Sequence, residues 1–214
     1  MSPPVPRRRL AARVMGVVAA LAVLALWAPA AHAGALVASA GSCPDQPLSQ
    51  PFLRWLDPSF YTLVPGGTFE DKAAGWSLTG DAATVRGSEP FAVTGDSGLR
   101  SLALPAGSSA TSPVFCAGIG HPTLRLFAQR TDGPSPGGLR VDVLFEDATG
   151  AVQTLTIGRL VDDGDWSPSL PSVVGANLLA LLPGNRTPLA FRFTPENGTS
   201  WLIDDVFVDP WRGN

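Results

Sequence analysis

The sequence predicts an all-β sandwich because of its composition, its turn residues and its strand-like patterning. The chain of 214 residues contains 23 Gly, 21 Pro and 10 Phe but a single Tyr, which is typical of many short strands joined by tight turns. Gly and Pro pairs separate the apolar runs, as at Gly66-Gly67, Gly133-Pro134 and Pro183-Gly184. Helical patterning is scarce, so stacked sheets account best for the pattern.

Short strand signals recur from Phe60 onward, with turn residues between them. We expect strands at Tyr61–Val64, Thr68–Asp71, Trp76–Leu78, Ala83–Arg86, Phe91–Val93, Arg100–Leu104, Thr111–Cys116, Thr123–Gln129, Leu139–Glu146, Val152–Ile157, Leu189–Thr194 and Leu202–Val208. A short helical turn is expected at Phe52–Leu56. The segment Val173–Leu182 is expected to begin as a strand and to end in a helical turn.

The N-terminus has the three parts of a secretory signal peptide. A basic region between Arg7 and Arg13 holds four arginines, and the apolar run Val14–Trp27 follows it. This run is shorter than the ~20 residues that a membrane span needs. Ala31-His32-Ala33 is a small-x-small cleavage site, so we expect cleavage after Ala33 and secretion. An uncleaved anchor is the alternative.

Cleavage would leave three regions: a signal peptide at 1–33, an irregular Pro-rich leader at 34–59 packed on the domain, and a β-sandwich at 60–214. Without the four leader arginines, 11 basic and 18 acidic residues remain, a net charge of −7. This sign disfavours nonspecific nucleic-acid binding, which depends on neutralising phosphates. No later apolar run is long enough to span a bilayer, so we expect no membrane span in the mature protein.

The chain contains two cysteines, Cys43 and Cys116. In an exported protein an even number of cysteines predicts a disulfide. Closing a loop of roughly 70 residues stabilises the fold by about 4 kcal/mol in the chain-entropy description, and it would tie the leader to the domain. A pair of free buried thiols is the alternative. With His121 as the single mature histidine, these residues do not make a zinc site of four protein ligands.

Two segments near the ends of the mature chain resemble the first and last strands of a galactose-binding-type jelly roll, the sandwich of many carbohydrate-binding modules. They are Gly66-Gly67-Thr68-Phe69-Glu70-Asp71, followed by Trp76, and Trp201-Leu202-Ile203-Asp204-Asp205-Val206-Phe207-Val208-Asp209-Pro210. The likeness covers about Thr68 to Pro210 and extends to small secreted proteins of high-GC Gram-positive bacteria. It implies a jelly-roll β-sandwich and confers no activity.

The same resemblance implies a structural calcium ion where the first and last strands meet. Carried over by position, Glu70 and Asp204 supply carboxylates, and the carbonyl of Thr68 is a further ligand. Calcium takes about six to eight oxygen ligands in a flexible geometry, which these groups suit. The alternative is a metal-free corner in which the ammonium of Lys72 neutralises a carboxylate.

Strand alternation favours Asp204 over Asp205 as the calcium ligand. The residues expected to share the core-facing side are Leu202, Asp204, Val206 and Val208. A carboxylate on that side needs a cation or several hydrogen-bond donors. Asp205 is expected on the opposite side, with Ile203 and Phe207.

Three predicted central strands each place an arginine between apolar neighbours. Because the apolar flanks face the core, the opposite face is expected to hold Arg125, Arg140, Asp142 and Arg192. In a jelly roll such a face is often a concave ligand groove, and arginine forks suit the hydroxyls and carboxylates of sugars. A solvated outer face with cross-strand ion pairs is the alternative.

The tryptophans divide into two expected groups. Trp76 and Trp201 lie on predicted strands and are expected in the core, whereas Trp55, Trp166 and Trp211 lie in loop-like contexts, where they could serve as platforms for a glycan.

The sequence therefore predicts a secreted, non-catalytic β-sandwich that binds a carbohydrate or another cell-envelope or extracellular ligand. His121 precedes Pro122 in an expected loop, and no Gly-x-Ser-x-Gly elbow accompanies it. No pair of carboxylates is marked for glycoside cleavage, so a hydrolase is disfavoured. The alternative is a structural or protein-interaction module without sugar specificity.

Overall fold

A computed structural model describes residues 36, 46–95, 98–118, 123–134, 136–147, 149–161, 164–175 and 186–209. The chain divides after His32, and all described residues belong to the second unit, Ala33–Asn214. The expected signal peptide and its cleavage site lie outside the described residues. The same holds for Cys43, His121, Trp211 and the expected helical turn up to Leu182.

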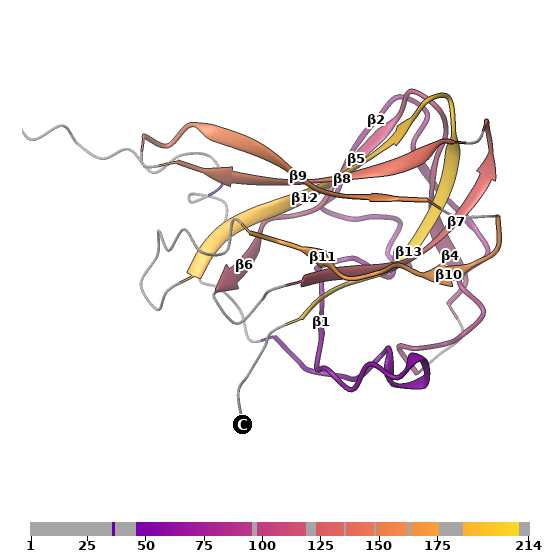
Figure 1. The fold of residues 1–214 in the computed structure, drawn as a ribbon, viewed down its shortest axis with the longest axis horizontal. Coiled ribbons are helices and arrows are strands. Elements are labelled where there is room, and N and C mark those ends of the chain that lie inside the picture. The colour runs from indigo at the N-terminus through magenta and orange to yellow at the C-terminus, as the bar shows by residue number, and fades with distance from the viewer. Residues whose placement is uncertain are drawn as a thin grey trace, which may run out of the picture. The chain divides into compact units, whose positions relative to one another are not determined.

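The described chain forms two antiparallel sheets (Figure 1). Sheet one has the order β10 (Ser167–Pro168), β7 (Thr123–Asp132), β13 (Ser200–Asp209), β4 (Arg100–Leu104) and β3 (Ala83–Arg86), with β1 (Thr62–Leu63) paired to β13 and β11 (Ser172–Val173) paired to β7. Sheet two has the order β2 (Ser77–Thr79), β5 (Ser109–Thr111), β12 (Arg186–Glu196), β8 (Gly138–Glu146) and β9 (Val152–Leu160), with β6 (Phe115–Gly118) paired to β12.

Successive strands cross from one sheet to the other, which gives the jelly-roll sandwich that the sequence predicts. The chain leaves sheet one after β4 for β5 and after β7 for β8, and it returns from β12 to β13. Apolar residues of both sheets meet in one core, where the largest side chains include Trp201, Phe191 and Phe193. Trp76 and Trp201 are buried in this core as expected. The all-β jelly-roll prediction is therefore confirmed.

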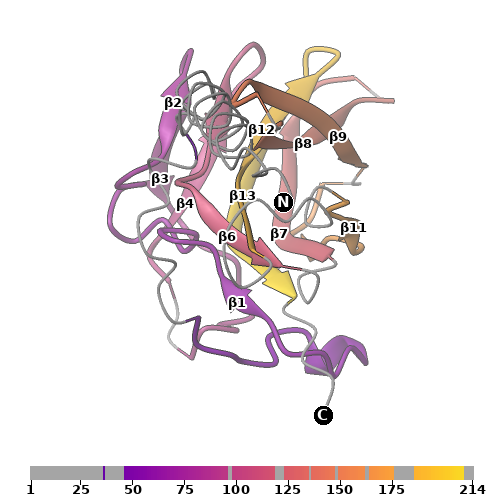
Figure 2. The same cartoon turned by 90° about the vertical axis from the view of Figure 1, so that its left-hand side faces the viewer.

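A second aromatic cluster covers the outer face of sheet one. Phe127 of β7 and Phe207 of β13 point away from the core and pack against Phe52 and Tyr61 of the N-terminal segment. The half-buried residues packed around them are Trp55, Leu63, Phe91, Val93 and Trp166. Trp55 and Trp166 thus contact this cluster instead of standing free. In Figures 1 and 2 the 3₁₀ helix η1 (Leu53–Trp55) of this segment lies at the opposite end of the molecule from β8 and β9.

Two expected strands are turns instead. The segment 68–71 contains no strand, and Phe69 has a φ of 57°, so the backbone there turns in the left-handed region instead of extending. The segment 91–93 is likewise a turn, with Ala92 at φ 52°. Conversely, β10 was not expected, because it has only two residues and contains Pro168, whereas β11 lies where the segment Val173–Leu182 was expected to begin as a strand. Among the described residues, no helix is long and apolar enough to cross a membrane.

Cys116 lies on β6 and is 4% exposed. Its carbonyl oxygen accepts a hydrogen bond from Nε2 of Gln46, at 3.0 Å. No free cysteine is present in the described part of the chain. The pairing with Cys43 remains a prediction, since Cys43 is outside the described residues.

We predict that the protein, produced by export and unfolded without reductant, contains no reactive thiol. The export that the N-terminus predicts would expose both cysteines to an oxidising compartment, and each has only the other as a partner within the chain. Thiol titration in denaturant measures this, and the reduced sample should give two thiols per chain as the positive control. Two thiols before reduction would contradict the bridge.

Candidate functional site

Two consecutive aspartates of β13 lie at a β-bulge. Asp204 pairs with Phe127 of β7, but Phe207 pairs with Arg125, so β13 contains one extra residue between these pairs. Asp205 has a φ of 47°, in the left-handed region. The bulge places neighbouring carboxylates in one corner of the molecule instead of on opposite faces.

The bulge overturns the expected facing of this strand. The β13 residues in the main core are Trp201, Ile203, Val206 and Val208. Ile203 and Val206 are three positions apart, because the inserted residue reverses the alternation between them. The expectation that Leu202 and Asp204 face the core together with Val206 and Val208 is therefore wrong.

Asp204 is 1% exposed and its carboxylate accepts three hydrogen bonds. Oδ2 accepts from Oγ of Ser88 at 2.7 Å and from the backbone N–H of Glu89 at 3.1 Å. Oδ1 accepts from the backbone N–H of Asp205 at 2.9 Å. Burial raises the pKa of Asp204 to about 7, against these hydrogen bonds, and the charge of Glu89 raises it further.

Asp205 faces a cavity of about 320 Å³. The cavity is lined by Thr68, Glu70, Ser88, Thr94, Gly98, Leu99 and Asp205. Asp205 is 4% exposed, and burial raises its pKa to about 8, with further increases from the charges of Asp204, Glu89 and Glu70. We call these four carboxylates the acidic corner.

The other two members of the acidic corner hold neighbouring turns in place. Oε1 of Glu70 accepts hydrogen bonds from the backbone N–H groups of Leu99, at 2.7 Å, and Arg100, at 2.9 Å. Glu89 is 4% exposed, and its carboxylate accepts the backbone N–H groups of Phe91 and Val93. Sequence reasoning missed Glu89, because an acid beside a proline in a turn gives no sign that it is buried.

The residues present fit a calcium ion by their chemistry. Glu70 and Thr68, both expected as ligands, line the cavity together with Asp205. Asp204 accepts a hydrogen bond from Ser88, which also lines the cavity, and both of its oxygens are hydrogen-bonded. Carboxylates and backbone carbonyls, such as that of Thr68, are the hard oxygen donors that calcium takes. Within the described ranges, no group of three or more His, Cys, Asp or Glu side chains is spaced as a ready-made metal site. Lys72 is exposed, and it forms no ion pair with any residue that the structure describes.

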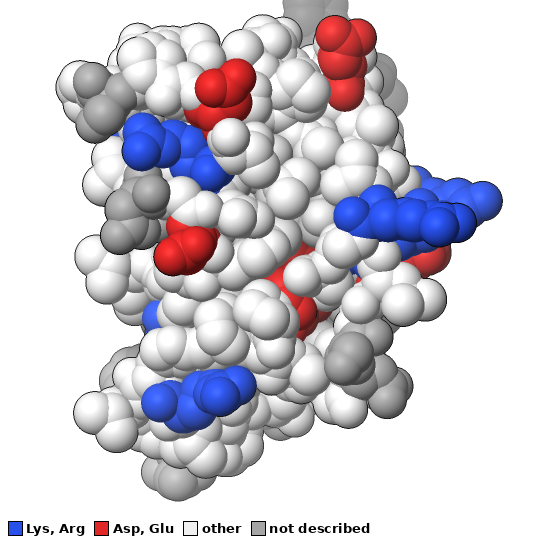
Figure 3. All heavy atoms as spheres, turned by 90° about the vertical axis from the view of Figure 1, so that its right-hand side faces the viewer, with Lys and Arg blue, Asp and Glu red and all other residues white. Residues whose placement is uncertain are grey.

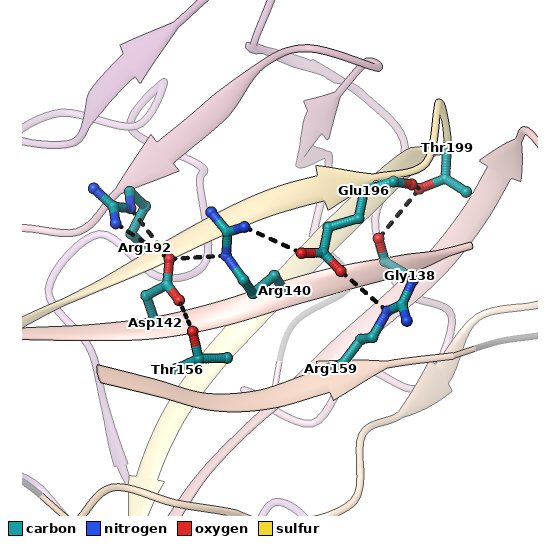
Figure 4. A network of polar contacts seen from close by, with 8 residues as sticks. All are labelled: Gly138, Arg140, Asp142, Thr156, Arg159, Arg192, Glu196 and Thr199. Carbon is teal, nitrogen blue, oxygen red and sulfur yellow. Dashed lines mark hydrogen bonds and ion pairs between the residues drawn. The ribbon is translucent and has the colours of Figure 1, made fainter. Parts of the chain in front are cut away.

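A second polar site lies on the outer face of sheet two (Figure 4). Its residues, which we call the polar row, are Arg140 and Asp142 of β8, Thr156 and Arg159 of β9, and Arg192 and Glu196 of β12. The β8 residues between them, Leu139, Val141 and Val143, point into the core. Strand register places Asp142 directly between Arg192 and Thr156.

Asp142 is the centre of the polar row and is 1% exposed. It accepts Nε of Arg140 at 3.1 Å, Nη2 of Arg192 at 3.2 Å and Oγ1 of Thr156 at 2.7 Å. Burial acts to raise the pKa of Asp142, but the hydrogen bonds from Thr156 and Arg140 hold it below its usual value. The group therefore stays ionised and fixes two guanidinium groups.

Glu196 extends the row toward the edge strand. It accepts Nη1 of Arg140 and Nε of Arg159, each at 3.1 Å. At the opposite end of β8, Glu146 accepts the backbone N–H of Leu36. Cross-strand ion pairs, the alternative expectation for this face, are thus present.

Arg125 does not belong to this face. It lies on β7 of sheet one, is 6% exposed, and pairs through Nη1 with Asp57 at 2.6 Å. Its Nε donates to the carbonyl oxygen of Ser169 at 2.9 Å, and its guanidinium carbon lies 4.0 Å from the ring centroid of Phe52. The expected grouping of Arg125 with Arg140 and Arg192 is wrong, because their strands belong to different sheets.

Solved structures of similar fold include carbohydrate-binding modules. The family 22 module and catalytic module of a Clostridium thermocellum xylanase, solved with xylohexaose, have 17% identity and a TM-score of 0.47, with 67% of this chain and 28% of that chain covered. The xylan-binding family 22 module from Paenibacillus barcinonensis has 15% identity and a TM-score of 0.45, with 69% and 94% covered. A family 61 module solved with β-1,4-galactotriose has 11% identity and a TM-score of 0.42, with 69% and 97% covered.

This chain thus spans less than a third of the xylanase chain that it matches. No protein-family model and no curated protein sequence matches it. The similarity to the solved structures concerns the fold and assigns no ligand to this chain.

Proposed function

We propose that this protein is an exported, non-catalytic binding module that holds a carbohydrate against the polar row of sheet two. The observation that carries the proposal is a set of guanidinium groups fixed in place yet open to solvent. The side chains of Arg140, Arg159 and Arg192 are 35%, 42% and 32% exposed. The outer face of sheet one is covered at β7 and β13 by the aromatic cluster.

Fixed donors favour binding because their rotamers are already ordered. Asp142 and Glu196 hold the three arginines before any ligand arrives, so less side-chain entropy is lost when a ligand binds. Hydroxyl groups of sugars accept hydrogen bonds from guanidinium groups, and hydrogen bonds to charged groups are stronger than neutral ones.

The proposal includes a structural calcium ion in the acidic corner. Glu70 and Asp205 line the cavity, and Asp204 and Glu89 stand close enough for their charges to act on Asp205. A divalent cation would remove the repulsion among these carboxylates and join β13 to the turns that Glu70 and Glu89 hold. Export is supported by the basic, apolar and small-residue parts of the N-terminus.

An exposed apolar strip favours a second candidate, a protein-interaction module. Leu53, Leu56 and Phe60 of the N-terminal segment are 54%, 93% and 49% exposed. Leu56 stands in the left-handed region, at φ 63°, which turns its side chain to solvent at a conformational cost. Glycan binding distinguishes the two candidates, because only the first requires it.

We predict that Arg192→Ala weakens glycan binding about tenfold, as expected for the loss of charged hydrogen bonds worth about 1.5 kcal/mol. Affinity electrophoresis with soluble polysaccharides and pull-down with insoluble ones measure the binding. Arg86→Ala is the matched control, because Arg86 is an exposed arginine on β3 of the other sheet. If no polysaccharide binds the wild-type protein, the proposal fails and the protein-interaction module is favoured.

A further inference from the structure

We propose that the polar row selects acidic polysaccharides, whose sugars carry carboxylate groups, over neutral ones; this inference rests on the proposed function. Its starting point is the unequal exposure of the two signs of charge. Asp142 is 1% exposed and Glu196 is 25% exposed, while the three arginines are 32–42% exposed. A ligand approaching this face therefore meets guanidinium N–H groups before it meets carboxylate oxygens.

The guanidinium groups also keep unused donors. Arg140 uses Nε and Nη1, Arg192 uses Nε and Nη2, and Arg159 uses only Nε in the contacts of the described residues. The two terminal nitrogens of Arg159 therefore form a free fork at the edge of the row. A planar pair of parallel N–H donors matches the two oxygens of a carboxylate, and such bidentate pairs are strong.

The charge of the polar row favours binding of an anion, although the net charge of the whole chain is negative. The polar row has three arginines against two acids, which leaves one positive charge uncompensated, whereas the chain has a net charge of −3. On the face shown in Figure 3, basic and acidic side chains are scattered over a mostly uncharged surface. Attraction of a polyanion by the single uncompensated charge of the row would be short-range, because salt screens it, which fits anionic groups spaced along a sugar chain.

The test compares polygalacturonate with the same polymer after reduction of its carboxyl groups, by calorimetry with the full-length mature protein. We expect the charged polymer to bind at least tenfold more tightly at low salt, and the difference to shrink in 1 M salt. Arg159→Gln should remove most of the preference while Arg86→Gln keeps it. Arg159→Lys, which keeps the charge but not the fork, should retain only part of it.

The outcomes separate the inference from the function on which it rests. Equal affinity for the charged and the reduced polymer would overturn the selection of carboxylates and leave the carbohydrate module standing. Binding of a poly(phosphodiester) wall polymer without binding of polygalacturonate would overturn it as well. If none of the polymers binds, the proposed carbohydrate-binding function is itself wrong. Thermal midpoints of the three Arg159 and Arg86 variants within a few degrees of wild type establish that they fold.

Discussion

Replacing Arg125 with Ala should destabilise the fold by about 3 kcal/mol and leave glycan binding unchanged. Arg125 is 6% exposed and supplies the ion pair to Asp57 and the hydrogen bond to the Ser169 carbonyl. Removing one partner of a buried pair leaves the other charge without compensation, which costs about 3–5 kcal/mol. The low end applies because the side chain of Asp57 is 19% exposed. Loss of the contact with Phe52 adds to the effect.

The measurement is the free energy of unfolding in denaturant, taken beside glycan affinity on the same preparation. Arg192→Ala is the matched comparison, since it should show the opposite signature of weaker binding with a smaller stability change. Arg125→Met tests the charge alone, because an apolar side chain of similar volume replaces part of the lost packing. If the Arg125→Ala protein has wild-type stability but binds glycan more weakly, Arg125 contacts the ligand and this prediction is wrong.

The arginines show what alternation along a strand can and cannot predict. Leu and Phe neighbours correctly indicate that Arg140 and Arg192 point away from the core, and the same pattern surrounds Arg125. Alternation reports the side of a strand, but it does not report which sheet the strand joins or what covers that sheet. Asp57, which buries Arg125, lies 68 residues away in the sequence.

Only part of the acidic corner could be predicted from the sequence, because its carboxylates come from segments that are far apart along the chain. The motif around Glu70 and the Asp204-Asp205 pair correctly indicated two segments that meet, and the structure places them at one cavity. The bulge at Asp205 has no signature in the sequence. The backbone N–H of Glu89 donates to Asp204 across 115 residues of sequence, and the Glu89 side chain acts on Asp205, so only the folded chain brings this residue to the site.

In excess chelator the protein should lose stability as the pH rises, and calcium should restore it. The pKa values of Asp204 and Asp205 are raised to about 7 and about 8, above the value of about 3.9 in an unfolded chain. The folded state therefore binds more protons than the unfolded state. The stabilisation of the folded state by these protons is complete below about pH 4, and it is lost as the pH rises through 7 and 8. A shift of three units corresponds to on the order of 4 kcal/mol.

Other carboxylates change the stability of the protein at different pH values, so their contributions can be distinguished from that of the acidic corner. The pKa of Asp142 and that of Asp57 lie below the usual value, so their contribution is lost only as the pH falls below about 4. Burial, with the charge of Asp57, raises the pKa of Asp209 to about 6. The stabilisation from its proton is therefore already lost by about pH 7. Thermal midpoints between pH 7 and 9 thus report mainly on the acidic corner.

Calcium binds the ionised carboxylates, so its stabilising effect should be greatest at pH 8–9, where repulsion without metal is strongest. At a concentration of 100 times the dissociation constant it would add about 2.7 kcal/mol. Asp205→Asn removes the carboxylate that lines the cavity and should abolish both the calcium response and most of the pH dependence. Asp204→Asn should reduce the pH dependence and measures whether Asp204 is also a ligand, while Asp81→Asn, at an exposed turn, should change neither. If the wild-type midpoint at pH 8.5 is the same in chelator and in calcium, and the purified protein contains no metal, the four carboxylates are held together by shared protons and the calcium proposal is wrong.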